Sequence, residues 1–529
     1  MLHFEDWQGG KKGDRTLKAL LPLVVLLMTA CHGWKNNEDK VLTMEAFSDM
    51  KTPAFVFDSH DIEQTIRQLA KDDKGQTEAD RLLRTYYADD QRPLVWVDRM
   101  GIDERADTLL AWLHRVGDIG LSEQAFAVSD IEQDLQRMRQ LDFDDHRHQA
   151  SKVAARLEYR LTKACLRYCC GQRYGFVNPH RLFNNLDIEK QDSTQRVLKY
   201  RGLFDVHMDL PNARFVRHVL HQVQADSLSD YLHTIQPTDS YYQQLKRMLP
   251  NAATNEQRRR ILVNMERARW RRQQPIIDNQ KRVVVNIPAY HLYAYGPEGV
   301  LDMKVVCGNV KTKTPQLSSY IEWMEVDPQW VIPMSIIENE VSRRAGDSAY
   351  FARNRYNIYD KATNRQLPVG AVTRQMLVSG KYRVAQEGGA GNSLGRIVFR
   401  FKNNFSVFLH DTSNPGAFSR DSRAMSHGCV RVSKPFDLAR FVLDEPDEWL
   451  LDRIRISMDL PPVGERGMEY VATHGSSNQK LIGYVPVKPR VPIYILYYTL
   501  WPDADGILQT WPDVYGYDDV MWKQLKSLI

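Results

Sequence analysis

Residues 281–308 read KRVVVNIPAYHLYAYGPEGVLDMKVVCG, and this stretch decides the fold class of the chain. Apolar residues alternate with polar ones on both sides of a Gly-Pro-Glu-Gly sequence at 296–299. That pattern is typical of two strands joined by a tight turn. Because the periodicity before residue 275 is helical, we expect a β-rich domain to begin near residue 276.

The part of the chain before this hairpin is predicted to be helical. Apolar positions recur at helical spacing among many charged residues from 36 to 274. One helix is expected in KVAARLEYRLTKACLRYCCGQRYGF (152–176), ending at Gly171, and a last one in RRRILVNMERARWRRQQP (258–275). Residues 32–275 are therefore predicted to form a helical scaffold domain.

The part of the chain after the hairpin continues with strand-like alternation. It recurs in SYIEWMEVDPQWVIP (319–333), in GRIVFRFKNNFSVFLH (395–410) and in VPIYILYYTLWPDADGILQTWPDVYGYD (491–518). Residues 337–392 are more polar, and we expect an inserted segment of helices and loops that covers a site as a lid. The predicted fold is α+β and multidomain: a β-rich domain at 276–460 with this insertion, followed by a C-terminal β extension at 461–529 that packs on the other domains.

The N-terminus has the features of an export signal. Several basic residues precede the apolar run ALLPLVVLLMTA (19–30), which ends at Cys31. The run is too short to span ~30 Å of hydrocarbon comfortably. The tail MTAC resembles a bacterial lipobox, although Met28 stands where leucine is commoner. Residues 1–31 are therefore predicted to be a signal peptide with Cys31 as the lipidation site, or else an uncleaved signal anchor; either places the protein in the periplasm or cell envelope, held at a membrane.

The net charge and the cysteines limit the classes of function that the sequence supports. A formal net charge of +5 over 529 residues does not predict nucleic-acid binding. Cys165, Cys169 and Cys170 have no histidine or C-x-x-C partner, so they predict apolar packing and not a zinc site. Five cysteines remain after Cys31, so at least one thiol of the exported chain stays unpaired. Cys429 is the candidate with a chemical reason to remain free.

Cys429 lies in FLHDTSNPGAFSRDSRAMSHGCVRV (408–432) together with two histidines. A thiolate is a strong nucleophile, and a histidine within roughly 3 Å of the sulfur supplies the base that forms it. His427 precedes Cys429 by two residues, whereas His410 ends a predicted strand and approaches Cys429 if the intervening loop returns as a long hairpin. Spacing alone leaves both histidines, and a buried structural thiol, as alternatives. Arg431 shares the strand face of Cys429 and is suited to clamp a carboxylate.

This segment resembles a known family. His410, a loop and SHGCVR (426–431) are similar to the signature of L,D-transpeptidases with a YkuD-type catalytic domain. The stretches VVVNIPAYHLYAY (283–295), VDPQWVIPMSI (326–336), GNSLGRIVFRFKN (391–403) and YYTLWPDADGILQTWPDVYGYD (497–518) resemble the large periplasmic, YcbB-like branch, in the same order. Two features depart from the family pattern: Phe408 stands where a tyrosine is common, and no peptidoglycan-binding module precedes the last helix.

The resemblance implies a role for each site residue. Cys429 corresponds to the nucleophile and His410 to the base, which favours His410 over His427. The backbone carbonyl of Asp411 is expected to orient His410, and the backbone near Gly428 and Cys429 is expected to hold the oxyanion. The residues that correspond to pocket or substrate-binding positions are Ser426, His427 and Arg431. Trp330 and Arg396 correspond to recurrent positions nearby, for which a structural role is expected before a substrate-binding one.

The resemblance also implies the reaction. The expected donor and acceptor are peptidoglycan stem peptides: the thiol attacks the carbonyl of the third residue, D-Ala leaves, and a side-chain amine of a second stem takes the acyl group. No metal or cofactor is implied, and no oligomeric state is predicted. The same acyl-enzyme also serves an L,D-carboxypeptidase or D-amino-acid exchange. A cysteine peptidase that cleaves polypeptides and a non-catalytic cell-wall lipoprotein are two further candidate functions.

Overall fold

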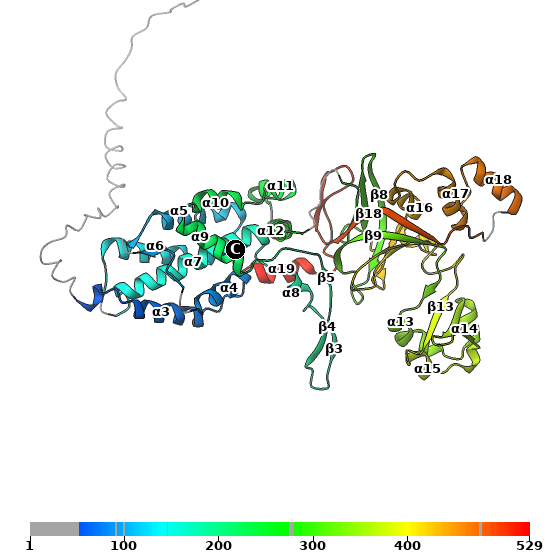
Figure 1. Ribbon diagram of the computed structural model, residues 1–529, viewed down its shortest axis with the longest axis horizontal. Helices are drawn as coiled ribbons and strands as arrows, with labels where there is room; N and C mark the ends of the chain where they lie inside the picture. Colours follow the sequence, from blue (N-terminus) through cyan, green and yellow to red (C-terminus); the bar gives the residue numbers. More distant parts are fainter. Residues whose placement is uncertain (1–51, 90–91, 99–100, 145, 274–279, 476–478) are drawn as a thin grey trace, which may run out of the picture.

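The computed structural model describes residues 52–529, apart from 90–91, 99–100, 145, 274–279 and 476–478. The predicted signal sequence and Cys31 lie outside the described residues. A helical body forms one end of the molecule and a β-rich domain the other (Figure 1). This arrangement confirms the predicted α+β, multidomain fold class.

The helical body is built around one long helix, α7 (Ala150–Tyr174), whose buried residues include Cys165, Cys169 and Cys170. Other helices pack around it: α3 (Ser59–Asp72), α4 (Glu78–Tyr87), α5 (Glu104–Leu113), α6 (Val128–Gln140), α9 (Ala213–Gln224), α10 (Leu228–Thr234), α11 (Ser240–Met248) and α12 (Asn255–Arg269). The amphipathic faces of these helices account for their packing, because each buries an apolar stripe against a neighbour. The predicted helical N-terminal region is thus confirmed for the described part, whereas the domain bounds 32–275 stay a prediction.

The expected end of α7 at Gly171 is wrong, because the helix continues to Tyr174 and its C-cap is Gly175. Gly171 is required for packing and not for a turn. A Cβ on it would lie 2.1 Å from the ring of Phe176, which folds back against the helix just after it ends. A glycine inside a helix thus marks close side-chain packing here.

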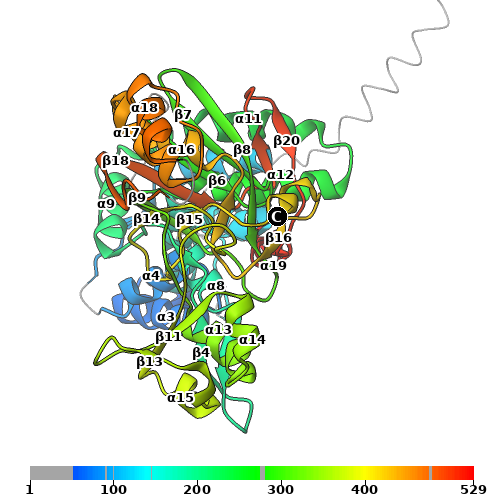
Figure 2. The same cartoon turned by 90° about the vertical axis from the view of Figure 1, so that its right-hand side faces the viewer.

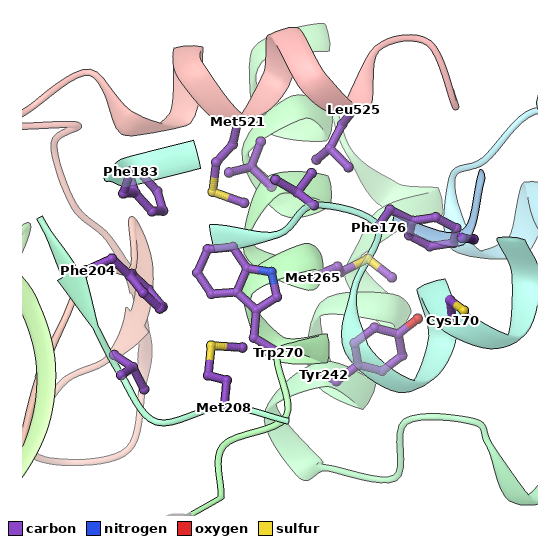
Figure 3. Packing of buried hydrophobic residues seen from close by; sticks show 14 of the residues in the cluster. Cys170, Phe176, Phe183, Phe204, Met208, Tyr242, Met265, Trp270, Met521 and Leu525 are labelled. Atoms are coloured by element: carbon purple, nitrogen blue, oxygen red, sulfur yellow. The ribbon is translucent and has the colours of Figure 1, made fainter. Parts of the chain in front are cut away.

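The helical body also takes up the C-terminus of the chain. Helix α19 (Tyr517–Leu525) places Met521 and Leu525 against the same core as Trp270 (Figure 3). Trp270 lies 6.2 Å from Phe183 of α8 (Pro179–Phe183) and 5.8 Å from Phe204 between ring centroids. The interior is continuous from the scaffold to the last helix of the chain.

The β-rich domain is a sheet that closes on itself. Its strands are β6 (Arg282–Asn286), β7 (His291–Gly296), β8 (Gly299–Gly308), β9 (Gln316–Val326), β14 (Ile397–Phe401), β15 (Leu409–His410), β17 (Val430–Val432) and β18 (Tyr484–Leu496). They follow the order β14-β15-β17-β8-β7-β6-β18-β9, and β9 pairs again with β14. A closed sheet leaves no free edges, so its interior can be filled with apolar side chains.

Two strands tie this domain to the rest of the chain. β5 (Phe204–Asp205), which lies in the helical half of the sequence, pairs parallel to β9. β18 lies between β6 and β9 in the middle of the sheet. The expectation of a β extension at 461–529 is therefore corrected: this range supplies a central strand, the hairpin β19 (Leu500–Pro502) and β20 (Leu508–Thr510), and the two helices α18 (Glu465–His474) and α19.

The insertion has an apolar core of its own and is more ordered than the polar sequence indicated. It begins at β10 (Trp330–Val331), ahead of residue 337, and contains α13 (Met334–Asn339), α14 (Ser348–Arg353), α15 (Arg374–Val378), β11 (Tyr356–Asp360), β12 (Gln366–Leu367) and β13 (Tyr382–Gln386). Its four strands form a separate sheet in the order β10-β13-β11-β12. The insertion projects from one side of the closed sheet (Figures 1 and 2).

The hairpin of β3 (Asp187–Gln191) and β4 (Val197–Arg201) extends from the helical half on the side where the insertion projects (Figure 1).

Three further helices, α16 (Pro435–Val442), α17 (Glu448–Ser457) and α18, lie beside the closed sheet (Figure 1). Within the described residues, none of the helices combines the length and apolar character that crossing a membrane requires.

Candidate active site

Cys429, His410 and Arg431 share one face of the closed sheet. β15 and β17 run parallel, with Leu409 paired to Val430 and His410 paired to Arg431. Since paired residues point to the same side and alternate residues share a face, the residue before Val430 lies on the face of His410 and Arg431. Leu409 and Val430 point to the other side and are fully buried.

The route that brings these residues together is not the expected hairpin. After His410 the chain forms a short 3₁₀ turn at Pro415–Ser419, and β16 (Ala424–Ser426) then pairs parallel to β8. The chain turns at Gly428 and returns beside β15 in the parallel direction. A parallel neighbour needs a crossover and not a tight return, which explains why the connecting loop is long.

The turn before Cys429 depends on Gly428. Its φ of 121° lies in a region that residues with a side chain rarely adopt. The Ser426 hydroxyl accepts a hydrogen bond from the Gly428 N–H at 3.1 Å and donates one to the Cys429 carbonyl at 2.6 Å. Ser426 is buried, so the structure places it as a support of the turn and corrects its expected role in binding substrate.

These contacts also change the expected oxyanion site. The N–H of Gly428 is already occupied by Ser426, and its carbonyl accepts from the Thr314 hydroxyl at 2.8 Å. The N–H of Cys429 has no hydrogen-bond partner in the described part of the chain. That N–H, and not the N–H of Gly428, is available to a developing oxyanion.

A loop that was not among the predicted site residues holds the turn from the other side. Asn309 and Thr312 both donate to the Ser426 carbonyl, from Nδ2 at 3.3 Å and from Oγ1 at 2.9 Å. A Cβ on Gly308 would lie 2.1 Å from the Thr312 carbonyl oxygen, so only glycine permits this fold of the loop. The sequence signal was the Gly-Asn pair after the strand, which marks a turn but does not indicate its partner.

The thiol of Cys429 is half-buried and protonated at rest. Burial raises its pKa to about 11, whereas the Phe408 N–H and the charges of Arg400 and Arg431 act in the opposite direction. Its Sγ donates a weak hydrogen bond to the Ser406 carbonyl at 3.9 Å. A base must therefore remove the proton when the thiol reacts.

His410 is the candidate base, and its neutral imidazole has the lone pair that accepting a proton requires. Burial, together with the charge of Arg431, lowers its pKa to about 3, although the backbone of Asp411 and of Leu394 beside the ring acts to raise it. Nδ1 is buried and reaches no hydrogen-bond partner among the described residues. The Asp411 carboxylate accepts a hydrogen bond from the Arg396 N–H at 2.8 Å, and the orienting role of the Asp411 carbonyl stays a prediction.

Arg431 and Arg400 bring two positive charges to this face. Arg400 forms an ion pair with Glu325 at 2.8 Å and lies 4.4 Å from the centroid of the Phe408 ring. Arg431 has no ion-pair partner within the residues that the structure describes, and its Nε is buried without a hydrogen bond. An uncompensated, partly buried guanidinium is suited to bind a carboxylate of a ligand.

His427 lies apart from this cluster. Its side chain is 53% exposed, and Nε2 lies 3.1 Å from Oε1 of Glu340 in the insertion. The ring therefore contacts the insertion next to the turn and is not directed at the sheet face of Cys429. This position fits a residue at the border of the pocket.

Two other predicted binding residues have structural surroundings. Trp330 begins the insertion and packs against its apolar core. Arg396 forms ion pairs with Asp327 at 2.8 Å and with Asp459. These surroundings agree with a structural role for both residues, and their part in substrate binding stays a prediction. Among the described residues, no group of three or more His, Cys, Asp or Glu side chains is arranged to hold a metal ion.

Comparisons with known proteins agree with this architecture. Residues 81–249 match the model of a Scaffold domain, and residues 280–463 match the model of YkuD, the L,D-transpeptidase catalytic domain. The chain therefore carries a YkuD L,D-transpeptidase catalytic domain behind a scaffold domain.

A protein from Haemophilus influenzae that is described as "Putative L,D-transpeptidase" is similar to part of this chain. The two are 26% identical over 331 residues, which is 60% of this chain. The match spans 62% of the relative's length. The resemblance found in the sequence is thereby confirmed at the level of the family and of the two domains.

Proposed function

We propose that the protein is a peptidoglycan L,D-transpeptidase with Cys429 as nucleophile and His410 as base. The observation that carries this proposal is the strand pair that holds His410 and Arg431: a half-buried thiol stands directly before its second strand, which carries an unpaired guanidinium opposite a neutral imidazole, within an L,D-transpeptidase catalytic domain. The substrate would be a tetrapeptide stem whose third residue is a diamino acid.

The first half-reaction forms an acyl-enzyme. His410 takes the proton of the Cys429 thiol as the sulfur attacks the carbonyl carbon of the third stem residue. The carbonyl oxygen becomes an oxyanion that the free Cys429 N–H stabilises. The C–N bond to D-Ala then breaks, and the imidazolium gives its proton to the departing amine. A thioester on Cys429 and free D-Ala are the products.

The second half-reaction transfers the acyl group. The side-chain amine of a diamino acid in a second stem attacks the thioester carbonyl, and His410 accepts the proton that the amine loses. The C–S bond breaks, the sulfur is protonated by His410, and a 3→3 cross-link results. Arg431 would hold a carboxylate of the stem during these steps. Water as the attacking group would give an L,D-carboxypeptidase, and a free D-amino acid would give exchange.

The predicted export signal agrees with this substrate. Peptidoglycan lies outside the cytoplasm, and a lipid on Cys31 would keep the enzyme at the membrane surface beside it. Both the lipid anchor and the periplasmic location are parts of the proposal, since residues 1–51 lie outside the described chain.

The proposal is tested by incubating the protein with purified tetrapeptide muropeptides and analysing the products by mass. Release of D-Ala with cross-linked dimers is expected. Tripeptides alone would indicate hydrolysis, and no change would contradict the proposed function. The Cys429→Ala variant should form neither product nor a covalent adduct with a carbapenem, while its thermal unfolding stays close to that of the parent. An adduct on that variant would exclude Cys429 as nucleophile.

A further inference from the structure

A large cavity lies away from Cys429, where the helical body meets the closed sheet. Its volume is about 890 Å³, within the range of ligand pockets. Its walls come from α10, α11 and the end of α12 on one side, and from β6, β7 and β19 on the other. None of its lining residues belongs to β15 or β17, so it is separate from the site of Cys429.

One wall of this cavity is aromatic. Tyr241, Tyr498 and Trp501 form a cluster with ring centroids 4.9 to 5.5 Å apart. Tyr498 is buried beneath the other two, whereas Tyr241 and Trp501 are only half-buried. The hydroxyl of Tyr241 donates a hydrogen bond to the Leu500 carbonyl. The ring of Tyr241, and not its hydroxyl, is therefore free to contact a ligand. Half-buried rings of this kind offer flat apolar surface with polar groups around it.

Polar groups surround the aromatic wall. Arg271 is 50% exposed and lies 3.6 Å from Asp209, and Arg272 donates to the Tyr498 hydroxyl. Several buried donors of lining residues have no hydrogen-bond partner in the described chain, among them Nε2 of Gln172 and Nε1 of Trp270 and of Trp501. Gln172 is 2% exposed and therefore cannot turn to solvent.

A ligand for this cavity needs apolar faces for the rings and several hydrogen-bond acceptors. We propose that the cavity binds a sugar chain, specifically the glycan strand of the polymer whose stem peptides react at Cys429. Sugar rings combine apolar C–H faces with hydroxyl and amide groups, and the oxygens of those groups can accept hydrogen bonds from the exposed Arg271 at the rim of the cavity. This inference rests on the proposed function for the identity of the polymer.

The two sites would then hold different parts of one substrate. The catalytic face takes the peptide, and the cavity between the domains takes the strand to which peptides are attached. A second contact of this kind raises the effective concentration of stems at the thiol without changing the chemistry there. Loss of the cavity would weaken binding of polymer and leave acylation by a small molecule unaffected.

The binding test uses the full chain carrying Cys429→Ala, so that no turnover occurs. Titration calorimetry is done with glycan strands stripped of stem peptides, with uncharged chitohexaose and with free tetrapeptide. The stripped strands should bind, and Trp501→Ala and Arg271→Ala should each raise their Kd by about tenfold or more, the scale of a lost aromatic or charged contact. The matched control is Trp449→Ala, a tryptophan on α17 that packs against Arg466 and Tyr470. It should leave the Kd unchanged.

The results separate this inference from the proposed function. An unchanged Kd in both cavity variants, or binding of free tetrapeptide alone, would overturn the glycan site. In chains that retain Cys429, the rate of carbapenem acylation, measured by intact mass, should be the same for Trp501→Ala and for the parent. A parent that acylates but binds no strand refutes only the glycan site, whereas a parent that does not acylate refutes the proposed chemistry. Arg271→Ala, on an exposed side chain, guards against unfolding of the tryptophan variant.

Discussion

His410 and Arg431 are directly paired across the parallel strands β15 and β17. The guanidinium therefore lies beside the imidazole on the face that carries Cys429, and no carboxylate of the described chain pairs with it. A cation at this distance disfavours the imidazolium, in the same direction as burial. The pairing keeps His410 in the neutral form that can accept a proton from the thiol.

The first prediction concerns the pH dependence of acylation. The reactive form has neutral His410, which predominates above its pKa of about 3, and a thiol on Cys429, which predominates below its pKa of about 11. The rate of carbapenem acylation should therefore stay nearly constant between about pH 5 and pH 8, where ordinary imidazole titrates. Stopped-flow or timed mass measurements provide the profile. An acid limb centred near pH 6.5 would show that His410 titrates as if exposed.

The second prediction distinguishes the two histidines. His410→Ala should lower the acylation rate by roughly 10²–10⁴-fold, the usual contribution of a general base. His427→Ala removes an exposed contact with Glu340, worth about 0–1 kcal/mol, so acylation should fall by no more than a few-fold. Both are compared by the rate of adduct formation at one pH. The reverse order would assign the base to His427.

The third prediction concerns recognition by Arg431. Arg431→Ala should raise KM for the tetrapeptide donor by about tenfold or more, because a charge-assisted contact to a carboxylate is lost. Arg431→Lys should bring KM only part of the way back to the value of the parent, since lysine cannot form the bidentate contact. The control is Arg420→Ala in the exposed loop before the turn. Equal KM values for the alanine variant and the parent would show that Arg431 does not bind the donor.

The sequence offered candidate site residues because Cys429, His410 and Arg431 lie within one short stretch of the chain. The SHGC motif placed Cys429 on a turn, and its resemblance to a family selected His410. The roles of Ser426 and Gly428 could not be predicted, since they depend on where each hydroxyl and N–H finds its partner. The supporting contacts of Thr312 and Thr314 come from a loop more than a hundred residues away.

The fold was predictable where periodicity decides it and not where distant segments meet. Helices and strands follow from the spacing of apolar residues, and the hairpin of β7 and β8 was expected from its turn. The position of β18 between β6 and β9 could not be predicted. Strand order depends on pairing between distant segments, which the local sequence does not reveal. The same holds for the return of α19 to the scaffold core.

The last prediction concerns the glycine inside α7. Gly171→Ala would place a methyl group where the Phe176 ring packs, and this ring is buried and cannot move to solvent. We expect the free energy of unfolding of the variant to be about 1–3 kcal/mol lower than that of the parent, as for other overpacked cores, although alanine has the better helix propensity. Gly117→Ala is the matched control, because nothing lies within 4 Å of its added Cβ and its φ is not positive. That change should be neutral or slightly stabilising. Denaturant unfolding of the two variants measures the difference, and equal midpoints would mean that the end of α7 relaxes to accommodate the methyl group.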